Sequence, residues 1–568
     1  MPTSSENLTV DTTCAVFIRT AERQPDATAL RTLDGFEMSW REARDRVFGI
    51  AGTLAGHGVK RGDTVAILLV NRPEFLLFDM ATIVAGGTPM SIYQTSPPAE
   101  IAYLLDDANV AVVVTEPRFE GTLREALETA KVSPTVLVLE EQIGKGLEAF
   151  DDGRQTFDGL RAAVSVTAAD IAVIVYTSGT TGPPKGVQLS HRNLGATWRA
   201  VSTYDRRVPE FERIISYLPA AHIADRVWGY LVALHTGATI TYVPDAKNIF
   251  AAMSQVQPSM FLGVPRIWEK LRAALQAGVP DGADVSDPVT AAEMRARSGL
   301  GPETLSLTGA APVDTDILDF FEKLGAPLLE VYGMTETSGM ISGNRAGFSK
   351  PGSVGQPFTG AEVRLSDDGE ILVRSDALLM AGYRNLPEKT AETIKSDGWL
   401  YTGDIGRIDD DGMITIIGRK KDIIITAGGK NISPANIEDA IRSATHLAGP
   451  VLVVGDRRSY IGAIISLDHD EVRSWAQNEG LPYSDVAELV NNPRLQERIA
   501  GAVAEVNRGL SRPAQIKRFI VVAEQWDPGS GCVTPTLKIK RRTATELYSV
   551  HIEDLYDPQK SALTPSAE

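Results

Sequence analysis

The chain has 568 residues, 43% of them hydrophobic and 23% charged, and a formal net charge of −17. This length exceeds one ordinary hydrophobic core and predicts a globular protein of two or more domains. The negative charge argues against a nucleic-acid-binding protein, and with only Cys14 and Cys532 present we expect no disulfide framework and a reducing, cytoplasmic environment.

The N-terminal segment is polar, and we expect residues 1–14 to form a disordered tail. It lacks the apolar core of a signal peptide. No apolar stretch of the chain reaches the roughly 18–20 residues that span a bilayer. The sequence therefore predicts no membrane-spanning segment and leaves open a peripheral contact with the inner membrane.

Strands and helices alternate over more than half of the chain, which predicts doubly wound, mostly parallel α/β sheets. Two similar layers of this kind predict a large N-terminal body with two such sheets, spanning residues 15–420. The predicted strands are 63–70, 110–115, 135–140, 171–176, 214–218, 239–243, 260–263, 304–307 and 328–332. The predicted helices are 72–86, 101–108, 123–131, 226–235, 249–256 and 315–324.

The most informative segment is the loop Thr177-Ser-Gly-Thr-Thr-Gly-Pro-Pro-Lys-Gly186, which follows the apolar strand 171–176. Glycines let backbone N–H groups point toward one centre, hydroxyls add donors, and Lys185 adds a positive charge. A Walker A loop would carry Ser or Thr directly after its lysine, and Gly186 stands there instead. The loop therefore predicts a polyphosphate site, and hence a nucleoside triphosphate, outside the P-loop class.

The composition changes from about residue 350, where short strands separated by Gly and Asp turns predict a small distorted β-barrel over 350–420. We place the domain boundary between Lys420 and Lys421. Residues 421–550 predict a small α+β domain, in which Ser433 caps a helix that begins with Pro434. The strands expected in these two regions are 361–365, 369–373, 406–408, 413–417, 423–426, 451–454, 461–466 and 519–522, and residues 551–568 are expected to form a C-terminal tail.

Four more segments carry side chains suited to a nucleotide. Tyr332-Gly-Met-Thr-Glu336 follows a predicted strand and offers a flat ring for a base, a hydroxyl for a phosphate and a hard oxygen ligand for Mg²⁺. Tyr401-Thr-Gly-Asp404 places a carboxylate in a turn, where it can accept hydrogen bonds from a ribose. Arg419 lies just before the domain boundary, and Thr534-Pro-Thr-Leu-Lys538 places a lysine near the end of the small domain.

In this order and spacing, the segments resemble the adenylate-forming superfamily of acyl-CoA synthetases, peptide-synthetase adenylation domains and luciferases. The resemblance runs from about residue 15 to residue 550. Two further segments, Leu218-Pro-Ala-Ala-His-Ile-Ala-Asp-Arg226 and Val264-Pro-Arg-Ile-Trp-Glu-Lys270, look like those of long-chain fatty acyl-CoA synthetases. The resemblance implies a ligase in which a fatty acid reacts with ATP to give acyl-AMP and pyrophosphate, and the thiol of CoA then displaces AMP.

For the first step, the resemblance implies that Lys185 and the loop hold the β- and γ-phosphates. Thr177 and Glu336 would hold Mg²⁺, and Lys538 would bring the fatty carboxylate to the α-phosphate. Tyr332 and the backbone of residues 309–311 would enclose the adenine, and Asp404 with Arg419 would hold the ribose. The other residues expected at the ATP site are Ser178, Gly179, Thr180, Thr181, Gly182, Gly309, Ala310, Ala311, Gly333 and Thr335.

For the second step, the resemblance implies that the small domain swings about Lys421. A turn would then face the large domain and leave room for the pantetheine of CoA, since its glycines lack side chains. His222 resembles the aromatic or histidine gate of the family beside the reacting carbonyl, so His222, Lys421 and Lys538 are the predicted catalytic residues. The predicted CoA-binding turn consists of Gly428, Gly429, Lys430 and Asn431.

Alternatives remain for the acceptor and for the acid. A fatty acyl-AMP ligase that loads an acyl-carrier protein would carry an insertion before the small domain, and no obvious insertion is present between Gly352 and Gly418. A medium-chain or aryl acid would suit the same motifs, as would a luciferase-like oxygenase. The length and saturation of the acyl chain and the oligomeric state are not determined by the sequence.

Overall fold

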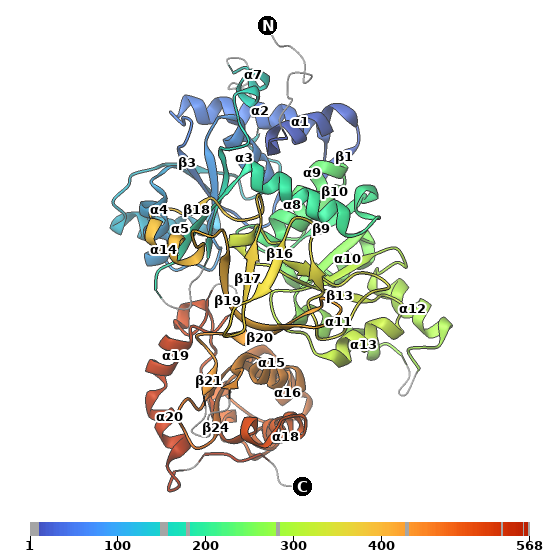
Figure 1. Cartoon of the computed structure of the whole chain (residues 1–568), viewed down its shortest axis with the longest axis vertical. Coiled ribbons are helices and arrows are strands. Elements are labelled where there is room, and N and C mark those ends of the chain that lie inside the picture. Colours follow the sequence, from blue (N-terminus) through green and yellow to red (C-terminus); the bar gives the residue numbers. More distant parts are fainter. Residues whose placement is uncertain are drawn as a thin grey trace.

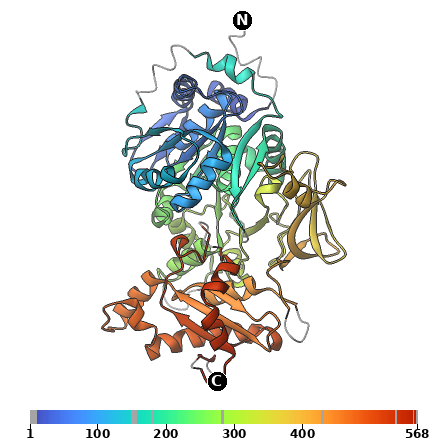
Figure 2. The same ribbon diagram turned by 90° about the vertical axis from the view of Figure 1, so that its left-hand side faces the viewer.

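The computed structural model describes residues 11–147, 157–177, 182–279, 284–425, 431–534, 538–560 and 562–565. A large body carries two sheets and a smaller antiparallel sheet, and a separate small domain lies beneath it (Figures 1 and 2). This arrangement confirms the predicted fold class.

A seven-stranded sheet forms the first layer of the large body, in the order β18-β8-β7-β4-β3-β5-β6. One face, with Val65 and Val112, packs toward the second sheet, and the other face, with Ala66 and Val113, packs under helices α4 and α5. The buried strands are therefore apolar on both faces, as parallel sheets require. The strands are β3 (Thr64–Leu68), β4 (Thr88–Ser91), β5 (Val110–Thr115), β6 (Thr135–Val138), β7 (Ile171–Thr177), β8 (Lys185–Ser190) and β18 (Gly382–Tyr383). The helices are α2 (Trp40–Gly56), α3 (Pro73–Val84), α4 (Pro98–Ala108), α5 (Glu120–Thr129), α7 (Gly159–Val164), α8 (His191–Tyr204) and α14 (Pro387–Thr393).

A nine-stranded sheet forms the second layer, in the order β15-β14-β13-β12-β11-β9-β10-β1-β2. Its centre is parallel, and β1, from near the N-terminus, pairs with β10, which lies far along the chain. The strands are β1 (Thr28–Thr32), β2 (Glu37–Ser39), β9 (Arg213–Ser216), β10 (Thr239–Tyr242), β11 (Met260–Gly263), β12 (Leu305–Thr308), β13 (Leu328–Tyr332), β14 (Ser342–Gly343) and β15 (Gln356–Pro357). The helices are α1 (Thr13–Arg23), α9 (Val232–Thr236), α10 (Ile249–Val256), α11 (Pro265–Gln276), α12 (Pro288–Ser298) and α13 (Thr315–Lys323).

One predicted helix differs in kind from the observed one. The sequence predicts a single α-helix over residues 226–235, and the chain instead forms a π-helix over Asp225–Leu231 that continues into α9. Wide π-turns are rare and occur mostly near functional sites. This one follows directly after the loop that carries His222.

The β-rich region forms a four-stranded antiparallel sheet in the order β16-β17-β19-β20, with a small core that includes Ile371 and Ile414. Among the described residues its outer strands β16 and β20 do not pair with each other, so the predicted small distorted barrel takes the form of an open half-barrel. The strands are β16 (Glu362–Leu365), β17 (Glu370–Arg374), β19 (Leu400–Ile408) and β20 (Ile414–Arg419). In Figure 2 it stands at one side of the large body, above the small domain.

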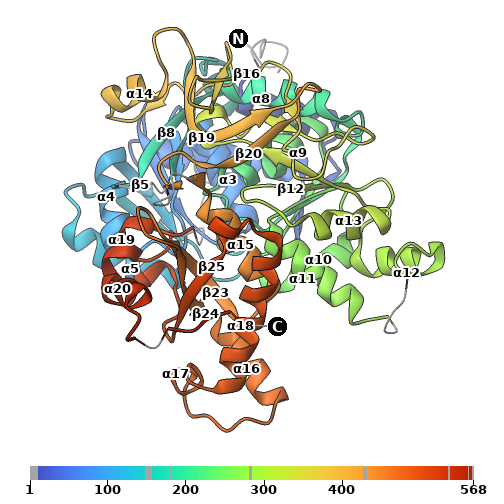
Figure 3. The same cartoon turned by 60° about the horizontal axis from the view of Figure 1, so that its bottom comes forward.

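The small domain is a three-stranded sheet covered by helices, with β24 between β23 and β25. Ser433 lies at the N-cap position of α15, and Pro434 begins the helix as predicted, but the Ser433 side chain accepts no capping hydrogen bond. Figure 3 shows α15 on the side of this domain that faces the large body. The elements are β21 (Ile424–Ile425), β22 (Asn431–Ile432), α15 (Pro434–Ala444), β23 (Ala448–Val454), β24 (Ile461–Leu467), α16 (His469–Asn478), α17 (Val486–Leu489), α18 (Pro493–Gly509), β25 (Ile516–Val522), α19 (Arg541–Leu547) and α20 (Ser549–Tyr556).

Helical structure extends into both predicted tails, past the expected boundaries at residues 14 and 551. Helix α1 begins at Thr13 because the Thr12 side chain caps it and its apolar face, including Cys14, is buried. Helix α20 runs to Tyr556 and buries Leu555. Among the described residues, no helix combines the length and the apolar character needed to cross a bilayer.

Candidate active site

The predicted phosphate loop connects the antiparallel strands β7 and β8, in which Thr177 pairs with Lys185. Residues 178–181, which include the predicted Ser178, Gly179, Thr180 and Thr181, lie outside the described residues. Gly182 has a φ of 92°, a left-handed conformation that glycine adopts without strain. The Thr177 hydroxyl donates to the Lys185 carbonyl at 3.5 Å. The hairpin therefore holds Thr177 and Lys185 side by side at the base of the loop.

Tyr383 connects the phosphate loop to the segment 332–336. Its ring lies 4.1 Å from the Lys185 ammonium, and its hydroxyl donates to Glu336 Oε1 at 2.7 Å. Burial lowers the pKa of Lys185, and Glu336 opposes this effect. Sequence reasoning missed Tyr383, because only the pairing of β18 with β8 brings it to a lysine that lies far earlier in the chain.

Asp404 is held between two predicted nucleotide-binding side chains. The Tyr332 hydroxyl donates to Asp404 Oδ2, and Arg419 Nε lies 2.8 Å from Asp404 Oδ1. Asp404 and Arg419 are direct partners in the pairing of β19 with β20. Burial raises the pKa of Asp404, while Arg419 opposes the shift. The structure thus brings together three residues predicted to surround adenine and ribose.

The ends of β12 and β13 provide the backbone next to this cluster. A side chain at Gly309 would place Cβ 2.9 Å from the Val331 carbonyl oxygen, and one at Gly333 would lie 2.0 Å from the Gly339 carbonyl oxygen. Ala310 has a φ of 70°, and Ala310 and Ala311 are exposed. A left-handed alanine costs free energy and is found most often at functional sites. The chain after β12 therefore offers an uncovered backbone surface, as expected for a base-binding loop.

Thr335 and Glu336 form the short 3₁₀ turn that follows, and both are buried. The described residues contain no cluster of three or more His, Cys, Asp or Glu side chains that could hold a metal by themselves. With Tyr383 on Oε1, the other Glu336 oxygen, Oε2, has no hydrogen-bond partner among the described residues. This carboxylate suits a metal that takes most of its ligands from a substrate and water.

Lys538 and His222 come from different domains and lie close enough to affect each other. Burial lowers the pKa of His222 to about 4, and the positive charge of Lys538 contributes to the shift. His222 Nδ1 accepts a hydrogen bond from the Ala224 N–H at 3.2 Å, which leaves the proton of the neutral ring on Nε2. The small domain therefore reaches the His222 loop of the large body.

The surroundings of Lys538 include both domains. Its side chain keeps contact with solvent at the domain junction, but the surrounding protein lowers its pKa, and Arg419 lowers it further. Asp404, Asp439 and Glu336 oppose the shift. Arg419 also lowers the pKa of Lys185 and of Lys421, after burial as the main cause. Cations from three segments therefore act on one another and on three carboxylates, and this surplus of positive charge favours a polyanionic ligand.

The chain passes between the domains at Lys420 and Lys421. Lys420 Nζ lies 2.6 Å from Asp368 and 2.9 Å from Glu370, so the half-barrel anchors it. Lys421 follows with an exposed side chain. The predicted CoA-binding residues Gly428, Gly429 and Lys430 lie outside the described residues, as does the side chain of Asn431.

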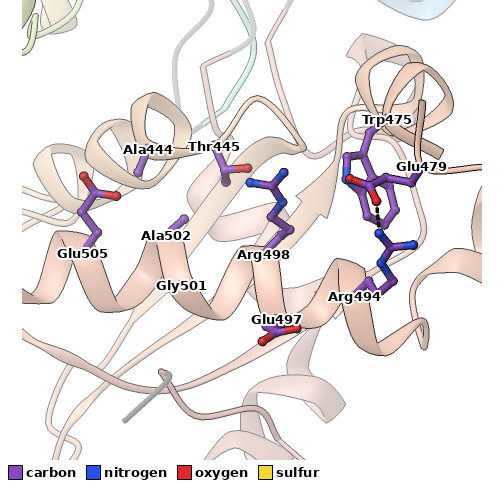
Figure 4. Close-up of a pocket in the computed structure, with 10 residues that line it drawn as sticks. All are labelled: Ala444, Thr445, Trp475, Glu479, Arg494, Glu497, Arg498, Gly501, Ala502 and Glu505. Atoms are coloured by element: carbon purple, nitrogen blue, oxygen red, sulfur yellow. Dashed lines mark hydrogen bonds and ion pairs between the residues drawn. The ribbon is translucent and has the colours of Figure 1, made fainter. Parts of the chain in front are cut away.

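A cavity of about 640 Å³ opens on the small domain, away from the predicted site. Figure 4 shows its lining between the end of α15, α16 and α18, with Trp475 and an ion pair between Arg494 and Glu479. None of its residues belongs to a predicted nucleotide motif. The predicted site residues lie elsewhere, on the large body and at Lys538 of the small domain.

Comparison with known proteins gives consistent matches over nearly the whole chain. Residues 17–384 match the AMP-binding enzyme family, and residues 421–560 match the C-terminal domain of AMP-binding enzymes. A putative fatty-acid–CoA ligase of Mycobacterium tuberculosis is 39% identical over 69% of this chain and 74% of its own length. A long-chain-fatty-acid–CoA ligase of Mycobacterium bovis is 31% identical over 93% of this chain and 94% of its own length.

Solved structures share the fold. ATP-bound MatB from Rhodopseudomonas palustris superposes with a TM-score of 0.71 and 26% identity, covering 94% of this chain and 99% of that chain. The anthranilate CoA ligase AuaEII, in complex with anthranoyl-AMP, gives a TM-score of 0.74 at 20% identity, covering 96% and 100% of the two chains.

Proposed function

The chain belongs to the AMP-binding enzyme family, and from this premise we propose that it is a long-chain fatty-acid–CoA ligase. Enzymes of this family adenylate a carboxylic acid with ATP and then form its CoA thioester. The observation that supports the residue assignment is the contact between predicted residues: Tyr383 contacts both Lys185 and Glu336, and Asp404 is held by Tyr332 and Arg419. Both domains contribute predicted residues to this site, and such a site suits a reaction that proceeds in two half-reactions.

In the first half-reaction, positive charge brings two anions together. The fatty carboxylate and the α-phosphate of ATP repel each other, and Lys538 offsets this repulsion where the domains meet. Lys185 and the hairpin at Thr177 hold the β- and γ-phosphates. Asp404 accepts from the ribose hydroxyls, with Arg419 keeping its carboxylate in place at 2.8 Å.

Glu336, with Thr177, is the proposed protein contribution to a Mg²⁺ site. Mg²⁺ commonly takes one or two carboxylates from a protein and its other ligands from phosphates and water. When bound, the ion would neutralise phosphate charge. Tyr383 holds Glu336 by its Oε1, which orients the second oxygen toward a ligand.

In the second half-reaction, Lys538 leaves the cleft and the thiol of CoA takes its place. Rotation about Lys421 would withdraw Lys538 and turn residues 428–431 toward the large body. Neutral His222 lies beside the position of the acyl carbonyl and leaves room for the thiol without adding charge.

The proposed function is tested by the release of pyrophosphate from ATP with saturated acids of two to twenty carbons, with and without CoA. We expect the highest rate with long chains, and acyl-CoA and AMP as products. A holo acyl-carrier protein in place of CoA tests the alternative acceptor, and benzoate tests an aryl acid. No exchange of labelled pyrophosphate into ATP with any acid would overturn the proposal.

Glu336→Gln is expected to raise the Mg²⁺ concentration that gives half-maximal adenylation by at least about ten-fold, because an amide is a poor ligand for a hard cation. Pyrophosphate exchange at graded Mg²⁺ concentrations measures this value. Tyr383→Phe is the matched control, since it keeps the ring next to Lys185 and removes only the donor to Glu336. An unchanged Mg²⁺ titration in Glu336→Gln would remove Glu336 from the metal site.

A further inference from the structure

The segment Val264–Lys270 has one buried and one polar side. It begins helix α11, whose Trp268 is fully buried and donates from Nε1 to the Gly263 and Leu307 carbonyls at 3.1 and 3.2 Å. The polar side presents Arg266, Glu269 and Lys270. Because Trp268 anchors α11 to the second sheet, the side chains of Arg266, Glu269 and Lys270 project from the polar side of the helix in a fixed orientation.

The three polar side chains of α11 contact the small domain. Arg266 lies 2.5 Å from Asp468, Lys270 lies 3.7 Å from Glu471, and the Ser443 hydroxyl donates to Glu269 at 3.1 Å. Figures 1 and 3 show α11 on the side of the large body that faces α15. We call Arg266, Glu269 and Lys270 the α11 polar face; it joins the two domains at a place apart from the chain connection at Lys420 and Lys421.

The contacted elements belong to the same rigid unit as Lys538. Helices α15 and α16 share one core, in which Ile437, Ile441 and Val472 are buried together. Glu438 of α15 forms a bidentate ion pair with Arg541, with both oxygens at 2.8 Å from the guanidinium. Arg541 comes three residues after Lys538, so the position of α15 sets the position of Lys538.

We propose that the α11 polar face positions Lys538 for the adenylation half-reaction, and that Arg266 is its principal positioning residue. The inference rests on the proposed function, since it concerns the two half-reactions of that site. A rotation that withdraws Lys538 carries Asp468 and Ser443 away from α11. The contacts therefore favour the first half-reaction and are absent during the second.

The test measures the two half-reactions separately in four variants: Arg266→Asp, Asp468→Arg, the double reversal, and Arg272→Asp as a control on the same helix. Arg272 points to Phe320, 5.6 Å from the ring centre, and contacts Gln276. Pyrophosphate exchange reports adenylation, and acyl-CoA formation from supplied acyl-AMP reports the second half-reaction.

We expect Arg266→Asp and Asp468→Arg each to lower pyrophosphate exchange about ten-fold and to leave thioester formation from acyl-AMP within about two-fold of wild type. The double reversal should restore exchange to within about three-fold, and Arg272→Asp should change neither rate. Equal losses in both half-reactions, or no restoration by the double reversal, would overturn the inference.

The same measurements separate this inference from the proposed function. A wild-type enzyme without acid-dependent exchange would refute the function itself. A wild-type enzyme active in both assays, with Arg266→Asp at wild-type exchange, would refute only the role of the α11 polar face. Thermal unfolding of each variant identifies a misfolded protein, and the double reversal then provides the decisive comparison.

Discussion

Lys538→Ala is expected to slow acyl-adenylate formation by about a thousand-fold, the size of effect seen when one preorganised donor to a transition state is removed. The Lys538 charge contributes to the lowered pKa of His222, and Asp404 and Glu336 oppose the lowering of the pKa of Lys538 itself. Conversion of supplied acyl-AMP and CoA to thioester should stay within about three-fold of wild type, because Lys538 leaves the cleft for that step.

Pyrophosphate exchange and acyl-CoA formation from acyl-AMP, measured on the same preparation, check this result. Lys560→Ala is the control, because Lys560 is exposed near Asp554 at the far end of the small domain. Lys538→Arg tests whether charge alone suffices, and we expect partial activity because the guanidinium is larger and planar. If Lys538→Ala lost both half-reactions to the same extent, this would contradict the proposal that Lys538 leaves the site before thioester formation.

Lys421→Pro is expected to give the opposite pattern: adenylation within about three-fold of wild type and thioester formation reduced by about a hundred-fold. Proline locks its own φ in one narrow range and restricts the residue before it, so a hinge at this position can no longer take a second conformation. Lys420 is held by Asp368 and Glu370, which leaves Lys421 as the first residue beyond the anchored strand. The same two assays measure the effect.

Lys421→Ala is the matched variant, because it removes the charge and keeps rotation about the backbone. It should retain both half-reactions, with a modest change in adenylation, since Lys421 also affects the pKa of Lys185. If Lys421→Pro forms thioester at the wild-type rate, the hinge lies elsewhere in the chain.

Local sequence patterns were enough to predict most of the fold and to identify the candidate nucleotide-binding residues. The predicted strands 110–115, 260–263 and 328–332 agree with β5, β11 and β13 to the residue, because each is a short, mainly apolar run bounded by polar, Gly or Pro residues. The loop before Lys185 follows β7 and the segment ending in Glu336 follows β13, at strand ends where such sheets bind ligands. Asp404 instead lies inside β19, paired with Arg419 of β20, and not in the turn that the sequence predicted. Their side chains are close together in the structure, although their roles remain predictions.

Local pattern did not determine the pairings between distant segments. The N-terminal elements α1, α2, β1 and β2 were not predicted, and β1 joins a sheet whose neighbouring strand, β10, lies far away in the sequence. Tyr383 reaches Lys185 and Glu336 only through the pairing of β18 with β8. The hydrophobic periodicity of a segment indicates which of its faces is buried, but it does not specify which distant segment packs against that face.

Only the folded chain establishes how the two domains meet. The sequence placed Lys538 in a separate domain, and only the structure shows the contacts of α11 with the start of α16 and with α15 of that domain. The pairs Arg266–Asp468 and Lys270–Glu471 are ordinary surface charges in the sequence. Their partners depend on the relative orientation of two bodies joined by one strand of chain, and that orientation is set by many weak contacts that no local motif encodes.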